Sequence, residues 1–244
     1  MIGRRYVRAA LRAAFLSQSD ERYRALSLFT NLVYPHFCHT ERAKLFLRDS
    51  QFLEDYYRFE RNPHSMDRKK MIIESLKLVR DVAGDTVECG AFQGATSYLM
   101  LAHGTTRRAH HIFDSFEGLS VPGPADGNYW HGGNLASTEG QIRHNLAKFA
   151  NVHYYKGWIP ERFHEVADGC FCFVHIDVDL YQPTRDAVEF FYPRLSPGGI
   201  VVCDDYGFAT CPGARKAVDD FATGKGVPVL DLPTGQGLLI KPRP

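Results

Sequence analysis

Hydrophobic residues along the chain follow two different periods, and the change falls near residue 82. Before that point apolar residues recur at steps of three and four, as in "MDRKKMIIESLKLVRDVA", and this period predicts helices. From Asp85 onward, short β-branched runs alternate with helical patterns. We therefore expect an N-terminal helical region, residues 1–82, followed by an α/β domain, residues 83–244. Ser19 or Asp20, Thr40 and Ser65 are the expected N-caps of the first helices.

The second region has the alternation that is typical of a parallel sheet covered by helices on both faces. Its last two strands are separated only by "PTGQ", which is too short for a crossover helix, so they are expected to pair antiparallel. The expected strands are "DTVECGAF", "RAHHIFDSF", "NVHYYKG", "CFCFVHIDVD", "GGIVVCDDY", "VPVLDL" and "GLLIK". The expected helices between them are Ala95–His103, Ser137–Phe149, Pro160–Ala167, Thr184–Tyr192 and Ala214–Thr223.

Composition excludes several classes of protein. The 244 residues can bury one substantial core and a helical appendage, and the net charge of +1 gives no reason to expect a nucleic-acid partner. No apolar run approaches the ~18 residues that span a bilayer. The six cysteines lack zinc-site spacing and indicate buried thiols in a reducing cytoplasm. The basic start "MIGRRYVRAALRAAF" resembles a transit peptide, although a packing or oligomer-forming helix is the preferred interpretation.

A glycine-containing turn predicts where a cofactor binds. In "VECGAFQGATS" a strand runs into Gly90 and Gly94 and then into a helix, whose N-terminus can approach a ligand closely. Asp114 closes the next strand, where an acid accepts hydrogen bonds from both ribose hydroxyls of an adenosine-type cofactor. Glu88 lies within the first strand, and either cofactor contact or a structural partner explains it.

Two further segments are candidates for the same pocket. Gly157 and Trp158 close the third expected strand and can form a wall for an adenine ring, with core packing of Trp158 as the alternative. The connection from Glu117 to Ser137 is long, rich in Gly and Pro, and carries "YWH" near its centre. A connection of this length is either a lid over ligand or a disordered excursion.

Four carboxylates follow two neighbouring strands: Asp177 and Asp179 after the fourth, and Asp204 and Asp205 after the fifth. Ligands of parallel sheets bind beyond these carboxyl ends. Like charges in one small volume need a compensating cation, and an all-oxygen set suits Mg²⁺, Mn²⁺ or Ca²⁺. Strand alternation predicts Asp177 and Asp179 on one side. Helix capping explains at most two of the four, and His175 is expected to be a core residue.

The motifs "VECGAFQGATS", "FDSFEGL", "HIDVDLYQPT" and "LSPGGIVVCDDY" together closely resemble the macrocin O-methyltransferase family. Those enzymes are Mg²⁺- and S-adenosylmethionine-dependent, and they methylate sugar hydroxyls in macrolide and aminocoumarin biosynthesis. The resemblance covers roughly residues 62–220 and implies a class I methyltransferase fold, a Rossmann-like, mostly parallel seven-stranded sheet. The expected layout of parallel units with an antiparallel end also fits this fold better than that of a nicotinamide dehydrogenase.

The resemblance also implies roles for individual residues. It makes Asp177, Asp204 and Asp205 the Mg²⁺ ligands and Asp179 the general base, and it places Met66 beside the cofactor. With the turn residues above, the expected cofactor-binding set is Met66, Glu88, Gly90, Gly94, Ser97, Asp114, Ser115, Gly157, Trp158 and Asp177. "YGFATCPGARKAV" and the N-terminal helices depart from the family pattern, which leaves the acceptor undetermined.

Other functions compete with methyl transfer to a sugar. Asp177-x-Asp179 is also the D-x-D of metal-dependent glycosyltransferases, and vicinal hydroxyls of a catechol would chelate the metal as a sugar diol does. Four retained aspartates argue against a non-catalytic scaffold. The expected partners are a small-molecule glycoside or a nucleotide-linked sugar as acceptor, and further copies of the chain in a homo-oligomer. The helical region of residues 1–82 is expected to cover the site or to form that interface.

Overall fold

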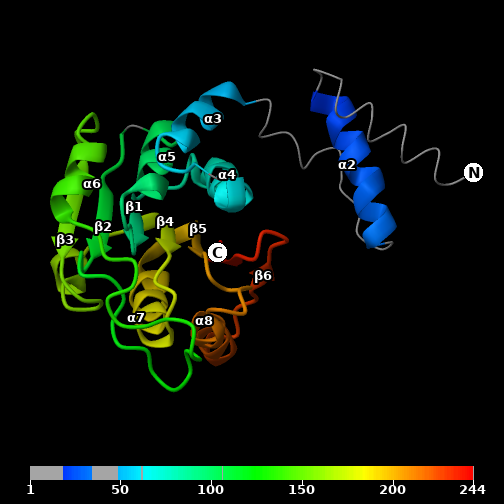
Figure 1. The fold of residues 1–244 in the computed structure, drawn as a ribbon. Coiled ribbons are helices and arrows are strands. Elements are labelled where there is room, and N and C mark those ends of the chain that lie inside the picture. The colour runs from blue at the N-terminus through cyan, green and yellow to red at the C-terminus, as the bar shows by residue number, and fades with distance from the viewer. Residues whose placement is uncertain (1–18, 35–48, 62, 106, 244) are drawn as a thin grey trace, which may run out of the picture. The chain divides into compact units, whose positions relative to one another are not determined.

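The computed structural model describes residues 19–34, 49–61, 63–105 and 107–243. The chain divides into two compact units, residues 1–53 and 54–244 (Figure 1). The first unit contains α2 (Ser19–Val33), and α3 (Ser50–Tyr57) runs across the division. The basic start of the chain and the expected N-cap Thr40 lie outside the described residues. None of the helices described is long and apolar enough to cross a membrane.

The second unit is built on a seven-stranded sheet with the order β3-β2-β1-β4-β5-β7-β6. The first five strands pair in parallel, and β7 pairs antiparallel with both β5 and β6. The expected parallel sheet with an antiparallel end is therefore confirmed. The strands are β1 (Asp85–Cys89), β2 (His110–Asp114), β3 (Val152–Lys156), β4 (Phe171–Ile176), β5 (Leu195–Cys203), β6 (Leu230–Asp231) and β7 (Gly237–Ile240).

Most of the expected helices form, with bounds that tertiary contacts adjust. The N-cap Thr138 accepts a hydrogen bond from the Gln141 N–H at 3.2 Å and starts α6 there. The segment expected as a helix over Pro160–Ala167 forms only a 3₁₀ turn, Phe163–Val166. The α-helices of this unit are α4 (Met66–Leu76), α5 (Ala95–His103), α6 (Glu139–Asn145), α7 (Tyr181–Phe191) and α8 (Pro212–Lys225). The 3₁₀ turns are η2 (Pro63–Ser65), η3 (Lys77–Val79), η4 (Phe163–Val166) and η5 (Tyr192–Arg194).

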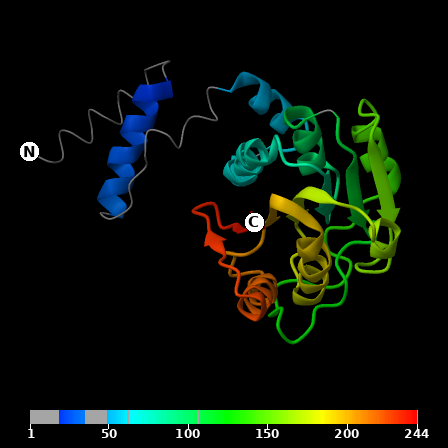
Figure 2. The ribbon, with the colours of Figure 1, turned by 180° about the vertical axis from the view of Figure 1, so that it is seen from behind.

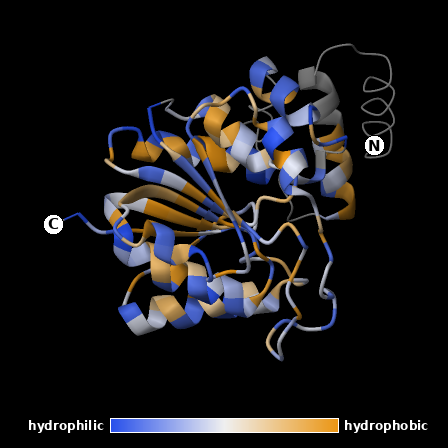
Figure 3. Cartoon of the chain, turned by 90° about the vertical axis from the view of Figure 1, so that its left-hand side faces the viewer, coloured by the Kyte–Doolittle hydropathy of each residue, from blue (hydrophilic) through white to orange (hydrophobic). Residues whose placement is uncertain are grey.

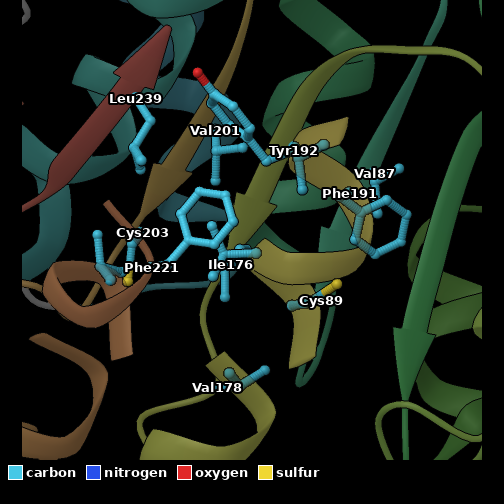
Figure 4. Close-up of a cluster of buried hydrophobic side chains, with 14 of the residues drawn as sticks. Val87, Cys89, Ile176, Val178, Phe191, Tyr192, Val201, Cys203, Phe221 and Leu239 are labelled. Carbon is cyan, nitrogen blue, oxygen red and sulfur yellow. The ribbon is translucent and has the colours of Figure 1, made fainter. Parts of the chain in front are cut away.

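The sheet lies between two helical layers, with α7 and α8 on one face and α4 and α5 on the other (Figures 1 and 2). The sheet is most apolar at its central strands β4 and β5, and the charged residues lie mainly on the outer sides of the helices (Figure 3). Val87 of β1 and Ile176 of β4 pack against Phe191 of α7 and Phe221 of α8 (Figure 4). Successive side chains alternate between faces, so Glu88 and His175 point to the side of α4 and α5.

Candidate active site

A cavity of about 270 Å³, open to solvent, lies at the carboxyl ends of the parallel strands. This is the edge where open α/β sheets bind their ligands. Seven of the residues expected at the site line it: Glu88, Gly90, Asp114, Ser115, Trp158, Asp177 and Asp179. Others were not anticipated from the sequence, among them Glu60, Lys69, Phe92, Thr96, Leu119 and Ile159. Met66, Gly94, Ser97 and Gly157 do not line the cavity, and neither do two of the expected metal ligands, Asp204 and Asp205, which are each 4% exposed.

The turn after β1 requires glycine because the backbone that follows the neighbouring strand β4 passes against it. Gly90 has φ +80°, and a Cβ there would lie 1.9 Å from the carbonyl oxygen of Asp177. Gly94, with φ +85°, begins α5, and a Cβ there would lie 2.7 Å from the side chain of Ile142. Gly90 therefore allows the turn after β1 to lie directly beside the acidic end of β4, and Gly94 allows the start of α5 to lie against α6.

Asp114 fastens this turn from the neighbouring strand. Its carboxylate accepts hydrogen bonds from the N–H groups of Ala91 at 2.7 Å, Phe92 at 3.0 Å and Phe116 at 2.6 Å. Burial raises its pKa, although these three donors act in the opposite direction. A carboxylate oxygen accepts more than one hydrogen bond, so Asp114 retains the capacity to bind ribose hydroxyls in the cavity that it lines.

Glu88 belongs to a buried chain of polar side chains beneath α5. The Ser97 hydroxyl donates to Glu88, and His110 Nε2 lies 2.9 Å from the same hydroxyl oxygen. On the other side, His175 Nδ1 lies 3.0 Å from Glu88 Oε1 and His175 Nε2 lies 3.3 Å from Asp204 Oδ1. The two carboxylates outweigh burial and raise the pKa of His175 to about 10, so the ring is a cation that binds both acids. The partners of Glu88 are thus Ser97 and His175, and Ser97 acts on the site through Glu88.

The four aspartates all lie just past the ends of their strands, because β4 ends at Ile176 and β5 at Cys203. The sequence predicted that strand alternation would place Asp177 and Asp179 on one side. Because both residues follow the end of β4, the turn after this strand sets the direction of their side chains instead. Asp179 has φ +59°, the left-handed conformation, and its N–H donates to Asp205 Oδ2 at 3.0 Å.

Two groups of potential ligands result from this geometry. His175, Asp177 and Asp204 offer atoms that lie within 4.8 Å of one another, and so do Asp179, Asp205 and Cys211. Both nitrogens of His175 already form hydrogen bonds with carboxylates, those of Glu88 and Asp204, which agrees with its expected role as a core residue. Asp205 is grouped with the expected base rather than with Asp177 and Asp204.

Because these carboxylates are close together and buried, their pKa values differ widely from one another. Burial, together with the nearby Asp204, raises the pKa of Asp177 to about 7 and that of Asp179 to about 6. Burial and the charges of Asp177 and Asp179 raise the pKa of Asp205 well above its usual range. Asp204 has a lowered pKa, because the hydrogen bond and charge of His175 and the charge of Arg68 outweigh its burial.

The donor set fits a hard divalent cation. Within the described part of the chain, the Asp177 side chain accepts no hydrogen bond and forms no ion pair, although it stands between other acids. Oxygen ligands of this kind suit Mg²⁺, and a divalent charge would remove the repulsion that keeps these groups partly protonated. Arg68 of α4 forms an ion pair with Asp204, and Gln236 Nε2 donates to Asp204 Oδ1 at 2.6 Å. The sequence pattern gave no signal for either contact, since both join segments far apart in the chain.

The connection of residues 117–137, expected as a lid or an excursion, lines the cavity through Gly118, Leu119, Ser120 and Leu135. It is fastened through Asp126 and Trp130 and through the Ser137 hydroxyl, which donates to the carbonyl oxygen of Phe92 at 2.7 Å. Asp126 is buried and accepts the N–H of Tyr181 at 2.6 Å, which starts α7 three residues earlier than expected. Trp130 Nε1 donates to Cys211 Sγ at 3.3 Å, and that thiol lies 3.4 Å from Asp179 Oδ1. Trp130 thus packs toward the expected base instead of projecting freely.

The strand order and the site at the carboxyl ends define a class I methyltransferase. The solved structures that share this fold include the O-methyltransferase NovP, with TM-score 0.59 and 24% identity over 72% of this chain and 80% of that one. They also include the calicheamicin methyltransferase CalS11, with TM-score 0.63 and 20% identity over 96% of this chain and 90% of that one.

Residues 63–231 match the model of the macrocin-O-methyltransferase family, and the chain belongs to this family. It is therefore an S-adenosylmethionine-dependent O-methyltransferase. A tetracenomycin-C rhamnosyl 4'-O-methyltransferase of Streptomyces olivaceus is 34% identical over 178 residues, 66% of each chain. The demethyldecarbamoylnovobiocin O-methyltransferase of Streptomyces niveus is 28% identical over 222 residues, 80% of this chain and 82% of the relative. The expected family and the expected fold class are both confirmed.

Proposed function

We propose that the protein methylates a hydroxyl of a sugar, free in a glycoside or linked to a nucleotide, with Mg²⁺ held at the acidic end of the sheet. The observation that carries the proposal is the unpaired carboxylate of Asp177, which lines the same cavity as the cofactor turn and Asp179. A curated relative supports the acceptor class, since its name specifies a rhamnosyl tetracenomycin.

Each group has a distinct role in the proposed reaction. Asp114 holds the ribose of the methyl donor, and Trp158 flanks its adenine. Asp177, Asp204 and Asp205 would hold the cation, with Asp205 approaching it from the side of Asp179. The bound cofactors supply the methyl group and a charge that lowers the pKa of the acceptor hydroxyl.

Asp179 removes the hydroxyl proton, a contribution of typically 10²–10⁴ in rate. Its position explains why it suits this role: its N–H is held by Asp205 and one of its oxygens faces the Cys211 thiol. The base is thereby held by neighbours on two sides while it lines the cavity. The residues of the 117–120 segment exclude water from the same space.

Assembly and location complete the proposal. We expect a homo-oligomer formed through the N-terminal helices, because Leu26, Phe29 and Leu32 of α2 are each more than half exposed, at 53%, 60% and 53%. Apolar exposure of this kind is typical of an interface.

We expect a reducing, cytoplasmic location, because the five described cysteines are all free. Light scattering of the purified chain tests the assembly.

Isothermal titration tests the central proposal. S-adenosylmethionine and then Mg²⁺ are titrated into the wild type, into Asp177→Asn and into Asp168→Asn, a matched change at an exposed aspartate. We expect cofactor heat in all three proteins and Mg²⁺ heat in all but Asp177→Asn. Mg²⁺ heat that survives in Asp177→Asn would exclude this residue as a ligand.

The acceptor class is tested separately. A methyl rhamnoside, a nucleotide-linked rhamnose and a catechol are offered to the loaded enzyme, and methyl transfer is followed by mass spectrometry. Transfer to either sugar supports the proposal. Transfer to the catechol alone would replace it with a catechol methyltransferase. Mg²⁺-dependent binding of a nucleotide sugar without any cofactor heat would instead favour the glycosyltransferase reading of Asp177-x-Asp179.

A further inference from the structure

Every oxygen of the Asp204 carboxylate has a partner in the structure. Oδ1 accepts from Gln236 Nε2 at 2.6 Å and faces His175 Nε2 at 3.3 Å. Oδ2 forms an ion pair with the Nη1 group of Arg68. Asp204 is itself 4% exposed, so these protein donors take the place of water around it. Oδ1 has two donors and Oδ2 has one, so a cation that binds Asp204 at Oδ2 meets the positive charge of the Arg68 guanidinium there.

The three donors differ in how easily they can leave. His175 is completely buried and is held on its other side by Glu88. Gln236 is also completely buried, and its amide nitrogen lies 3.3 Å from the carbonyl oxygen of Arg68. The Arg68 side chain is 23% exposed. Among the residues that the structure describes, Arg68 is thus the only donor of Asp204 with a path toward solvent.

The guanidinium of Arg68 supplies the charge that a metal ion would supply. The carboxylates of Asp204, Asp177 and Asp205, in that order, outweigh the effect of burial and raise the pKa of Arg68. These are the three groups assigned above to the cation. Its other neighbour is the ring of Phe208, with 4.7 Å from Cζ to the ring centroid, a contact that does not depend on Asp204.

We infer that Arg68 and the divalent cation exchange at Asp204 Oδ2, so that the guanidinium binds this carboxylate when the metal is absent and leaves it when the metal binds. The inference rests on the proposed Mg²⁺ site. Two like charges cannot share one carboxylate oxygen at contact distance without strong repulsion. The ion pair therefore lowers the affinity for the metal and stabilises the acidic end of the sheet before the metal arrives.

Calorimetric titration of Mg²⁺ into metal-free protein tests the exchange. We compare the wild type with Arg68→Met, which keeps the length of the side chain, and with Arg80→Met, which removes one charge from an exposed arginine. We expect Arg68→Met to bind Mg²⁺ roughly tenfold more tightly, because no charge-assisted hydrogen bond has to be broken, and Arg80→Met to bind like the wild type. Arg68→Lys, which keeps the charge but loses the fork, should lie between the wild type and Arg68→Met.

Thermal melts provide a second measurement that does not depend on the heat of binding. In EDTA we expect Arg68→Met to melt below the wild type, and saturating Mg²⁺ should remove the difference. If the wild type binds Mg²⁺ and both Arg68 variants bind it equally or more weakly, the exchange is wrong. If no variant binds Mg²⁺, the proposed metal site itself is wrong. Binding by Arg68→Met alone would support the exchange, because the wild-type affinity is then suppressed by the ion pair.

Discussion

Glu88 and His175 lie opposite each other on neighbouring parallel strands, and His175 Nδ1 is 3.0 Å from Glu88 Oε1. The same imidazole reaches Asp204 with its other nitrogen, so one buried cation joins a residue of the cofactor cavity to a residue of the acidic end. The two halves of the site therefore share a charge network within the core of the sheet. Several measurable consequences follow from this arrangement.

Replacement of His175 by Gln should destabilise the protein strongly. The change leaves Glu88 and Asp204 buried without the cation between them, and removal of one partner of a buried ion pair costs about 3–5 kcal/mol. Urea denaturation followed by circular dichroism measures the loss. His144→Gln changes an exposed histidine and should shift the free energy of unfolding by less than about 0.5 kcal/mol. Equal effects of the two changes would show that His175 does not carry the network.

Asp177 and Asp179 should make the stability of the metal-free protein fall as the pH rises from about 4 to 7, the reverse of the usual behaviour of acidic groups. His110, whose pKa is lowered to about 4 by burial, contributes the opposite slope, so the two aspartates are tested by the difference between wild type and variant. Asp177 and Asp179 have pKa values raised to about 7 and about 6, so the folded state holds their protons in a range where the unfolded chain has lost them. The free energy of unfolding therefore decreases as the pH rises, by about 1.4 kcal/mol for each unit of pKa shift. Mg²⁺ should reverse the trend near pH 7.

The raised pKa of His175, about 10, continues the same slope at higher pH, because its charged form stabilises the fold and is lost as the pH approaches 10. Free energies of unfolding measured in EDTA from pH 4 to 9 test both parts. Asp177→Asn removes one of the raised groups and should flatten the curve between pH 4 and 7. The same slope between pH 4 and 7 in Asp177→Asn as in the wild type would contradict the assignment.

Gly90→Ala should abolish binding of both cofactor and metal. A Cβ at this position would lie 1.9 Å from the carbonyl oxygen of Asp177, so the turn after β1 and the end of β4 must move apart. The positive φ adds a cost of roughly 1–2 kcal/mol. Calorimetry and urea denaturation measure the two effects.

Gly140→Ala is the matched control for this change. Gly140 lies in α6, and a Cβ there would meet nothing within 4 Å. Alanine should stabilise the helix by roughly 0.5–1 kcal/mol and leave ligand binding unchanged. If Gly90→Ala behaves like Gly140→Ala, the close approach of the two strand ends is not as described.

Asp126→Ala should release the segment of residues 117–137 from the protein. The carboxylate accepts the N–H groups of Tyr181 and Gly123, and a buried donor left without its acceptor costs about 1–3 kcal/mol. Chymotrypsin cleavage after Tyr129, which is exposed, should become at least several times faster. Asp168→Ala should leave the cleavage rate unchanged. An unchanged rate in Asp126→Ala would mean that the contacts of Trp130 and Ser137 are sufficient to fasten the segment.

Local patterns in the sequence determined most of the fold. The sequence predicted a parallel sheet with an antiparallel end. The evidence was the strand runs, the helical patterns between them and the short "PTGQ" connection, which depend only on the period of apolar residues and on connection length. The positions of the four aspartates after two consecutive strands were sufficient to predict that carboxylates gather at the carboxyl edge of the sheet. The family motifs then placed the same residues in a methyltransferase.

Contacts between distant segments were decided only by the tertiary structure. Arg68 and Gln236 reach Asp204 from 136 and 32 residues away in the chain, and no local period describes such contacts. Asp126 sets the start of α7 from the long connection, and the left-handed turn at Asp179 replaces the alternation expected of a strand. Sequence periodicity records which side chains are buried and where polar groups end a strand. The partner that satisfies each buried charge depends on packing of the whole sheet, which brings those groups within hydrogen-bond distance.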